Sequence, residues 1–382
     1  MKILSVVGAR PNFMKIAPFI RAISVYNEKA DKRQAVEHIL VHTDQHYDDN
    51  MSRVFFKDLS IPKPDINLSI GSGSHAEQVG NTMIAFEKVL RELKPDWVVV
   101  VGDVNATLAC SVTAKKELVK CAHIEAGLRS RDMSMPEEIN RLVTDNLCDL
   151  LFTPDRLSTQ NLRTEGVPEE KIKFVGNIMI DTLELYREKA GMKDLKEIVG
   201  KSINTKINPL EIKDENFMVT TLHRPSNVDV PEVLSALVHF FTQTVSGDLP
   251  LIWPVHPRTR KQLELFGLWD TLFSCKNIII TEPLGYLDML RLNMGAKAIL
   301  TDSGGLQEEC TILGTPCLTL RWNTERPVTL TTHGGASVLT GNDINRIKEE
   351  FQIALNKQRK PVRPELWDGK TAERCLEEIV SN

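Results

Sequence analysis

The fold is decided by the stretch Trp97-Val98-Val99-Val100-Val101-Gly102-Asp103. Its apolar residues run without an alternating polar one, so a strand formed here would bury both of its faces. Strands of that kind are typical of parallel sheets that helices cover on both sides. The glycine and aspartate that follow place a turn and a carboxylate at the strand's carboxyl end. Trp97–Val101 therefore predicts one strand of a parallel α/β sheet.

Outward from this stretch, short apolar runs alternate with segments of helical periodicity. Further strands are expected at Lys2–Val7, Val36–His42, Ala122–Glu125, Leu150–Thr153 and Ile172–Val175. The helices expected between the strands are Met14–Tyr26, Ala76–Leu93, Ala106–Leu118, Glu137–Asn146 and Ser158–Glu165. Strand–helix alternation of this kind predicts a doubly wound parallel sheet.

The second half of the chain repeats the pattern after a polar, lysine-rich stretch, Glu188–Asn216, which we interpret as a linker around Asn208-Pro209. Strands are expected at Phe217–Leu222, Leu251–Val255, Ile278–Thr281, Ala298–Thr301 and Cys317–Leu320. Helices are expected at Pro231–Val245, Arg258–Leu265, Leu287–Met294, Leu306–Leu313, Asp343–Asn356 and Thr371–Val380. Two such α/β domains predict a cleft between the carboxyl ends of their strands, where ligands of open sheets bind.

The composition narrows the function. Lys plus Arg number 47 and Asp plus Glu 51, a net charge of −4, which argues against a general nucleic-acid binder. No apolar run approaches the roughly 18–20 residues of a membrane span. The first expected strand begins at Lys2, which leaves no room for a signal peptide. The seven cysteines include no Cys-x-x-Cys pair, so we expect reduced, mostly buried thiols in a cytoplasmic protein.

Polar residues gather where the strands of the first domain end. The first strand runs into Gly8–Asn12, and a helix with Lys15 in its first turn follows. Free N–H groups at a helix N-terminus suit an anion, and Arg10 and Lys15 would add positive charge. The turn lacks a Gly-x-Gly-x-x-Gly pattern, so a tight turn with two solvated cations remains an alternative.

Three carboxylates follow at neighbouring strand and helix ends, at Asp103, Glu125 and Glu137. We expect them to converge on one rim of the sheet, where crowding would shift their pKa values as acids and bases require. Glu137 and Arg141 share one helix face because they stand four residues apart. By itself that segment also fits a plain acidic helix start with a salt bridge.

The second domain places different chemistry at its strand ends: His223-Arg224, His256, Asp302–Gly305 and Glu325–Pro327. Small residues at Ser303-Gly304-Gly305 would let a diphosphate approach a helix N-terminus, and an acid one turn further in could bind a ribose diol. A simple glycine turn is the alternative for this stretch.

Two places in the sequence carry residues of the kind that bind metals. His42 and His46 stand four residues apart beside Asp44 and Asp48, but no further ligand stands nearby at a suitable spacing. Asp302 and Glu309 could also attract magnesium, although contact with a nucleotide explains them better. We therefore expect no metal.

Taken together, the motifs resemble the non-hydrolysing UDP-N-acetylglucosamine 2-epimerases over nearly the whole chain. The matching stretches are Gly8–Pro11, Gly102-Asp103, His123–Arg129, Pro136–Arg141, Gly176-Asn177, His223-Arg224, Pro254–His256, Asp302–Glu309 and Glu325–Pro327. The resemblance implies a GT-B type of α/β fold, with two Rossmann-like doubly wound domains and the active site in the cleft between them. The domains would span residues 1–190 and 191–365, and a C-terminal helix within 366–382 would cross back to the first.

The resemblance also implies a reaction, the interconversion of UDP-N-acetylglucosamine and UDP-N-acetylmannosamine by elimination and re-addition of UDP. No NAD, metal or other cofactor is used. It implies Asp103, Glu125, Glu137 and His223 as the catalytic residues, with Arg141 orienting Glu137. It implies that substrate is held by Arg10, Lys15, Arg141, Ser303, Gly304, Gly305, Glu309 and Arg326. We further expect a UDP-sugar substrate, a homodimer, and neither nucleic acid nor membrane as a partner.

The chain departs from the family pattern at some positions. Asn12 replaces a common acid after Arg-Pro, and Ala9 replaces a common threonine. Bacterial members carry His-Arg-Arg-Glu where this chain has His223-Arg224-Pro225-Ser226, a stretch that in those enzymes helps to bind a second substrate molecule as an activator together with the segment matching Gln45-His46. Activation by substrate is therefore expected to be weak or absent.

Other functions stay open on the sequence. Relatives epimerise other UDP-2-acetamido sugars, including a 2,3-diacetamido glucuronate. A GT-B glycosyltransferase, a hydrolysing epimerase and a non-catalytic sensor of nucleotide sugars are the further alternatives. Three carboxylates on the sugar side disfavour the glycosyltransferase, since inverting transfer usually needs one base.

Overall fold

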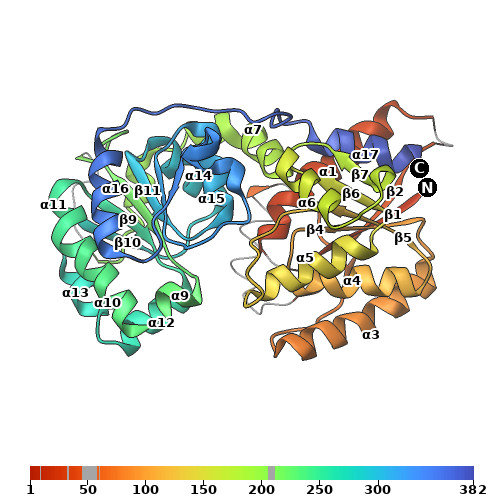
Figure 1. The fold of residues 1–382 in the computed structure, drawn as a ribbon, viewed down its shortest axis with the longest axis horizontal. Helices are drawn as coiled ribbons and strands as arrows, with labels where there is room; N and C mark the ends of the chain where they lie inside the picture. Colours follow the sequence, from red (N-terminus) through yellow and green to blue (C-terminus); the bar gives the residue numbers. More distant parts are fainter. Residues whose placement is uncertain (9, 32–33, 45–57, 60, 205–210) are drawn as a thin grey trace. The chain divides into compact units, whose positions relative to one another are not determined.

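The computed structural model describes residues 1–8, 10–31, 34–44, 58–59, 61–204 and 211–382 (Figure 1). The chain divides into two compact units. Unit 1 is Met1–Leu185 with Pro364–Asn382, and unit 2 is Tyr186–Arg363. Asn208-Pro209, the expected centre of the linker, lies outside the described residues.

Unit 1 contains a seven-stranded sheet in the order β3-β2-β1-β4-β5-β6-β7, and every neighbouring pair is parallel. Its strands are β1 (Lys2–Val7), β2 (Glu37–His42), β3 (Ile66–Asn67), β4 (Trp97–Val101), β5 (Lys120–Ile124), β6 (Leu150–Thr153) and β7 (Ile172–Phe174). Its helices are α1 (Arg10–Lys29), α3 (His75–Leu93), α4 (Asn105–Lys116), α5 (Pro136–Leu147), α6 (Arg156–Thr164), η1 (Glu169–Lys171), most of α7 (Ile178–Gly191) and α17 (Thr371–Ser381). The parallel sheet expected from Trp97–Val101 is confirmed, and all five residues of that strand are buried.

Unit 2 contains a six-stranded parallel sheet in the order β10-β9-β8-β11-β12-β13. Its strands are β8 (Met218–Thr221), β9 (Leu251–Pro254), β10 (Ile278–Thr281), β11 (Ala298–Thr301), β12 (Cys317–Thr319) and β13 (Ser337–Leu339). Its helices are α8 (Leu195–Val199), α9 (Pro225–Val228), α10 (Pro231–Phe240), η3 (Phe241–Val245), α11 (Ser246–Asp248), α12 (Pro257–Leu265), α13 (Trp269–Ser274), α14 (Tyr286–Gly295), α15 (Gly304–Leu313), η4 (Pro327–Thr329), η5 (Thr331–His333) and α16 (Ile344–Asn356).

Several short elements were not expected from the sequence. The two-residue strand β3 and the three-residue strand β13 add one edge to each sheet. Helices α7 and α8 occupy part of the stretch interpreted as a linker, and α8 buries Leu195, Ile198 and Val199 in the core of unit 2. These elements are too short, or too rich in polar residues, for periodicity to reveal them.

The C-terminal helix belongs to unit 1. Helix α17 packs against α1, and the Asp181 carboxylate accepts the N–H groups of Thr371 and Ala372 at its first turn, at 3.1 and 2.7 Å. Figure 1 shows α17 beside α1, close to the N-terminus of the chain. No helix among the described residues is long and apolar enough to cross a membrane.

Each sheet reverses its strand order at one place. In unit 1 this place lies between β1 and β4, and in unit 2 between β8 and β11. Loops after two such strands run in opposite directions and leave a crevice at their carboxyl ends, where α/β proteins bind ligands. Gly8 and Gly102 follow the strands in unit 1, and Leu222 and Asp302 follow them in unit 2.

Candidate functional site

In unit 1, Asn12 ties together the two strands at the reversal of the sheet. Its side-chain oxygen accepts the N–H of Gly8 at 3.1 Å, and its amide donates to the carbonyl of Val101 at 2.8 Å. Asn12 is 1% exposed. An amide can donate and accept at once, which a carboxylate cannot, so the departure from the family's acid has a structural consequence here.

Lys15 and Glu125 form a buried ion pair beside this tie. Lys15 is 5% exposed and Glu125 is 4% exposed. Gly102 lies against the pair, because a Cβ on it would stand 2.9 Å from the Lys15 Nζ and 3.4 Å from the Glu125 Oε2. The alternative of a turn with solvated cations is therefore wrong for Lys15. The side chain of Arg10 lies outside what the structure describes.

Asp103 lies two residues after β4 and Glu137 lies in the first turn of α5, and both are half-buried. Arg141 forms an ion pair with Asp103 and donates from Nε to Glu138 at 3.0 Å. Glu138 also accepts the N–H groups of Ser130 and Arg131, at 2.9 and 2.8 Å. Burial alone would raise the pKa of Glu138, but these donors and the Arg141 charge lower it.

The family resemblance implies that Arg141 orients Glu137, four residues before it. The structure shows Arg141 bound to Asp103 and to Glu138, three residues before it, so this arginine links the end of β4 to α5. Its role toward Glu137 stays a prediction. Both spacings share a helix face. Glu138 is 2% exposed, and the sequence does not reveal this burial.

In unit 2, His223 and Asp302 meet at the reversal of the sheet. The His223 Nδ1 lies 2.7 Å from the Asp302 carboxylate, which also accepts the N–H groups of His223 and Arg224 and the Asn227 amide. Asp302 is fully buried, which opposes ionisation, yet the His223 charge and these donors lower its pKa to about 2. The expectation that Asp302 contacts a nucleotide is wrong, because its oxygens are used inside the unit.

Helix α15 starts directly after this contact, at Ser303-Gly304-Gly305. Ser303 occupies the N-cap position, but its side chain makes no capping bond. Its half-buried hydroxyl and the first N–H groups of the helix are the donors that an anion would use. A Cβ on Gly304 would stand 2.6 Å from Arg326 Nη1 and 2.9 Å from Glu325 Oε1. A side chain at position 304 would therefore require Arg326 or Glu325 to shift.

Arg326 and Glu309 are both buried near the start of α15. Arg326 donates from Nε to Glu308 at 2.8 Å and pairs with Glu325, which Arg321 also binds at 2.7 Å. Glu309 accepts from Asn293 at 3.3 Å, and burial raises the pKa of this carboxyl to about 7. These two predicted binding residues are thus held by partners of unit 2.

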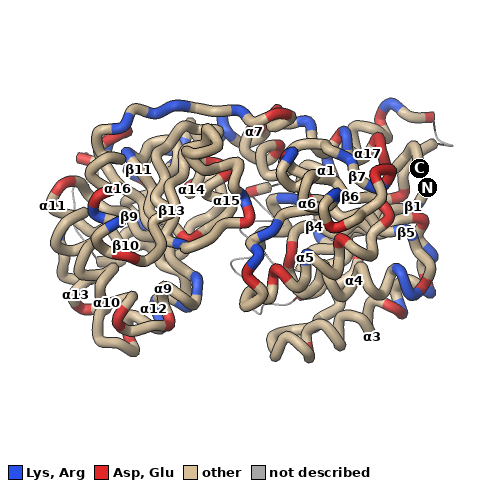
Figure 2. The backbone as a smooth tube through the Cα atoms, in the orientation of Figure 1, with Lys and Arg blue, Asp and Glu red and all other residues tan. Residues whose placement is uncertain are grey.

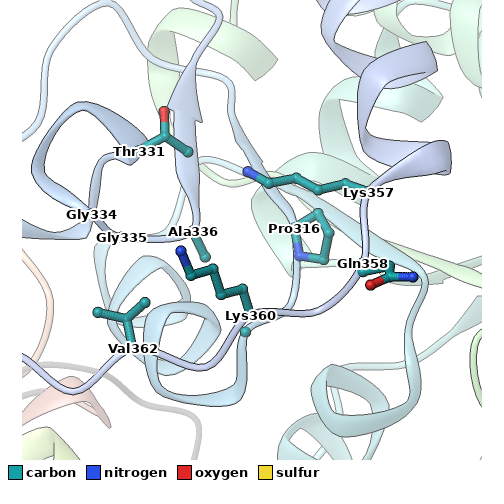
Figure 3. A pocket seen from close by; sticks show the side chains of 10 residues that line it. Pro316, Thr331, Gly334, Gly335, Ala336, Lys357, Gln358, Lys360 and Val362 are labelled. Carbon is teal, nitrogen blue, oxygen red and sulfur yellow. The ribbon is translucent and has the colours of Figure 1, made fainter.

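A separate pocket of about 210 Å³ lies elsewhere in unit 2 (Figure 3). Pro316 and Ala336 line it, and they precede β12 and β13, so the pocket lies at the amino ends of these strands. Lys357 and Lys360 border it, from a segment after α16 that Figure 2 shows as mostly basic. It is at the opposite edge of the sheet from His223 and Ser303 and does not belong to their site.

Among the described residues, no group of three or more His, Cys, Asp or Glu side chains could hold a metal ion. His46 and Asp48, the candidate ligands beside His42, lie outside those residues. His42 itself packs against the ring of Phe13, with centroids 5.4 Å apart.

Similarity to known proteins shows to which family this chain belongs. The family model of UDP-N-acetylglucosamine 2-epimerase matches residues 28–380. The UDP-N-acetylglucosamine 2-epimerase of Methanocaldococcus jannaschii is 44% identical over 98% of both chains. The chain belongs to the UDP-N-acetylglucosamine 2-epimerase family. The resemblance seen in the sequence is thereby confirmed, and the family is one of isomerases.

A solved structure and a second curated relative add information on the fold and on the sugar. The crystal structure of the Methanocaldococcus jannaschii UDP-GlcNAc 2-epimerase with UDP-GlcNAc and UDP has a TM-score of 0.88 at 41% identity and covers 100% of both chains. The α/β fold of GT-B type expected from the sequence is confirmed. A UDP-2,3-diacetamido-2,3-dideoxy-D-glucuronate 2-epimerase of Pseudomonas aeruginosa is 38% identical over 94% of this chain and 93% of its own length.

Proposed function

We propose that this chain is a non-hydrolysing epimerase that interconverts UDP-N-acetylglucosamine and UDP-N-acetylmannosamine at carbon 2. The family supports this reaction, and one observation carries it to particular residues. Each unit gathers its candidate residues at the reversal of its own sheet, carboxylates with a lysine in unit 1 and a histidine with a helix N-terminus in unit 2. The elimination of UDP from a sugar requires two chemically different sets of groups, one that acts on the sugar and one that binds the departing nucleotide.

The unit 1 residues would act on the sugar. The proton on carbon 2 has no adjacent carbonyl to stabilise an anion, so departure of UDP must run ahead and build positive charge on the ring. Carboxylates stabilise such a charge and can remove and return the proton. We assign these roles to Asp103, Glu125 and Glu137. Arg141 would hold Asp103, and Lys15 would hold Glu125.

The unit 2 residues would bind the nucleotide and stabilise its departure. The N–H groups at the start of α15 and the Ser303 hydroxyl would bond the diphosphate. His223, which is 38% exposed at its side chain and oriented by Asp302, would donate to the departing oxygens. We assign Glu309 to the ribose diol and Arg326 and Arg10 to the phosphates or the sugar. No NAD or metal takes part in this reaction.

A second candidate substrate is a UDP-2,3-diacetamido glucuronate, because a relative named for that sugar matches nearly the whole chain. A carboxylate on carbon 6 of the sugar would need a cation that a neutral sugar does not. We favour the N-acetylglucosamine nucleotide because the more similar relative carries that name. The expected homodimer and a role in supplying polysaccharide precursors stay predictions, and sedimentation velocity tests the first.

The test is turnover of each UDP-sugar by the pure protein in deuterated water, followed by proton NMR without any acceptor. The proposal expects deuterium at carbon 2 of both epimers of UDP-N-acetylglucosamine. Epimerisation without exchange at that carbon would exclude the proton-transfer mechanism. Release of stoichiometric free sugar and UDP would indicate a hydrolysing enzyme, and exchange of the glucuronate alone would change the substrate. Binding without turnover would indicate a sensor, and a requirement for an acceptor would indicate a glycosyltransferase.

A further inference from the structure

Glu125 has a backbone conformation that L residues disfavour. Its φ is +80°, in the left-handed region, which costs about 1–2 kcal/mol for a residue with a Cβ. Its N–H and that of Ala126 both donate to the carbonyl of Phe152, at 3.1 and 3.0 Å. A turn of this kind persists only where surrounding contacts hold it. The structure must therefore contain groups that keep Glu125 in place.

A fully buried pair, His123 and Asp145, supplies those contacts. His123 lies two residues before Glu125, and its Nδ1 is 2.6 Å from the Asp145 Oδ1. The other oxygen of Asp145 accepts the N–H of Gly127, two residues after Glu125, at 3.0 Å. The Asp145 carboxylate therefore binds the chain on both sides of Glu125.

The same histidine also reaches the strand that carries Asp103. Its Nε2 lies 2.8 Å from the carbonyl of Gly102, and a carbonyl oxygen can only accept, so this nitrogen donates. Gly102 has a φ of +69° and directly precedes Asp103. One imidazole therefore joins the turn of Glu125 to the turn of Asp103.

Neighbouring residues restrict the movement of His123 and Asp145. Arg129 binds the second oxygen of Asp145 at 2.7 Å and is itself held by Glu165 at 2.6 Å. Burial opposes ionisation of Asp145, but the His123 and Arg129 charges lower its pKa. A Cβ on Gly127 would stand 2.4 Å from the carbonyl of Ser158, so this turn cannot shift toward α6.

A buried ionic cluster is not required to stabilise the sheet. Replacement of such clusters by apolar side chains is often neutral or stabilising, because burying charge costs several kcal/mol. Earlier in the same strand, the N–H of Cys121 also donates to a carboxylate, but that group, Asp149, is 32% exposed and pairs with Lys115 at 2.7 Å. The pair at the carboxyl end of β5 is fully buried, and both of its backbone contacts flank candidate carboxylates.

We propose that His123, held by Asp145, is a positioning residue that fixes Glu125 and Asp103 relative to each other for proton transfer at carbon 2. This inference rests on the proposed function of those two carboxylates. His123 touches backbone rather than substrate, so it acts through the two turns. Loss of the contacts that His123 makes with Asp145 and Gly102 should displace the two carboxylates, while the nucleotide-binding residues of unit 2 stay in place.

The test uses His123→Gln and Asp145→Asn in the full chain, with His38→Gln and Asp181→Asn as matched controls. His38 is a half-buried histidine of β2 whose ring bonds Ser5, and Asp181 is a buried acid that caps α17. A glutamine can reach Gly102 or Asp145 but cannot join both. The assay measures kcat, KM and the UDP dissociation constant. It also measures the ratio of released intermediate, which is free UDP with 2-acetamidoglucal, to epimerised product.

The ratio separates positioning from folding, because a smaller folded fraction lowers both products equally. We expect both variants to lower kcat by about 10–100-fold, the usual loss when a supporting residue is removed. The ratio of intermediate to epimer should rise at least tenfold, KM and UDP affinity should stay within about threefold, and the double variant should resemble either single one. The controls should keep the wild-type ratio.

Hydrogen exchange gives a readout that does not depend on turnover. The Gly127 amide should lose protection in Asp145→Asn and keep it in Asp181→Asn. An unchanged ratio of intermediate to epimer, together with unchanged exchange protection of the Gly127 amide, would show that His123 and Asp145 do not hold the two turns in place. An unchanged ratio with lost protection also overturns the positioning role and leaves the proposed epimerase intact. Wild-type protein that does not exchange carbon 2 overturns the proposed function instead, and the positioning role with it. If His123→Gln does not fold, Asp145→Asn alone decides.

Discussion

His223 and Asp302 contact each other across the reversal of the second sheet, 2.7 Å apart, with Asp302 fully buried and His223 facing outward. Asp302 also accepts backbone N–H groups from the loop that carries His223. The carboxylate therefore fixes both the ring and the loop. Because all of its partners prefer the ionised form, the contact is also coupled to pH.

The first prediction concerns acid stability. The folded pKa of Asp302 is about 2 and its ordinary value is 3.8, so its stabilisation is present above about pH 4 and is lost as the pH falls toward 2. Denaturant unfolding between pH 2.5 and 6 should show this loss in the wild type and a flatter curve in Asp302→Asn. Asp248→Asn removes an exposed acid of the same unit and should leave the curve unchanged. Parallel curves for wild type and Asp302→Asn would refute the coupling.

The second prediction concerns the carboxylates of unit 1. Asp103→Asn and Glu125→Gln should each lower kcat by about 10²–10⁴, the range of general acid–base catalysis. UDP affinity should survive, because UDP is assigned to unit 2. Glu170→Gln, at an exposed site of the same unit, is the control and should keep full activity. Calorimetry with UDP and the deuterium assay measure the two effects, and weaker UDP binding in step with kcat would contradict the division of roles.

The third prediction concerns Glu309. Glu309→Ala should weaken UDP binding by about 1.5–3 kcal/mol, the scale of a hydrogen bond to a charged group. An unchanged dissociation constant would make this glutamate a structural residue. Its raised pKa of about 7, caused by burial, has a further consequence. The ordinary value is 4.5, so its contribution to stability is full below about pH 4.5 and is lost as the pH rises to 7. Glu309→Gln should remove that part of the pH dependence of unfolding.

The fourth prediction concerns the close approach at Gly304. Gly304→Ala should displace Arg326 and Glu325, and the overpacking should cost about 1–3 kcal/mol of unfolding free energy. UDP affinity should fall because the start of α15 moves with them. Gly247→Ala is the matched control in unit 2, since a Cβ there meets nothing within 4 Å. Equal unfolding free energies for the two variants would show that the side chains of Arg326 and Glu325 yield without cost.

The fifth prediction concerns activation by substrate. Pro225 opens the short helix α9 and cannot pair with a phosphate, and Ser226 is a short neutral residue whose carbonyl accepts from Asn342. The backbone N–H of Arg224 is already bound to Asp302. Pure UDP-N-acetylmannosamine should therefore be converted at once, with a hyperbolic rate curve. A lag that a trace of UDP-N-acetylglucosamine abolishes would show that a second site persists. Gln45 and His46 lie outside the described residues.

Strand periodicity predicted much of the fold. The Val-rich run before Gly102 and its counterparts are long enough, and apolar enough, to be recognised without a structure. The short edge strand β13 and the helix α8 escaped because their residues are buried by tertiary neighbours rather than by their own pattern. Periodicity reports only burial that repeats along a segment.

What the sequence by itself determined is which residues stand at the carboxyl ends of parallel strands, and hence that Asp103, Glu125, His223 and Ser303 are available for chemistry. Tertiary structure decided the partners. Arg141 binds Asp103 and Glu138, Lys15 is buried against Glu125, and Asp302 orients His223. The physical reason is that strand ends follow from local pattern, whereas ion pairs depend on distances of a few ångströms between segments far apart in the chain and on how completely water is excluded from them.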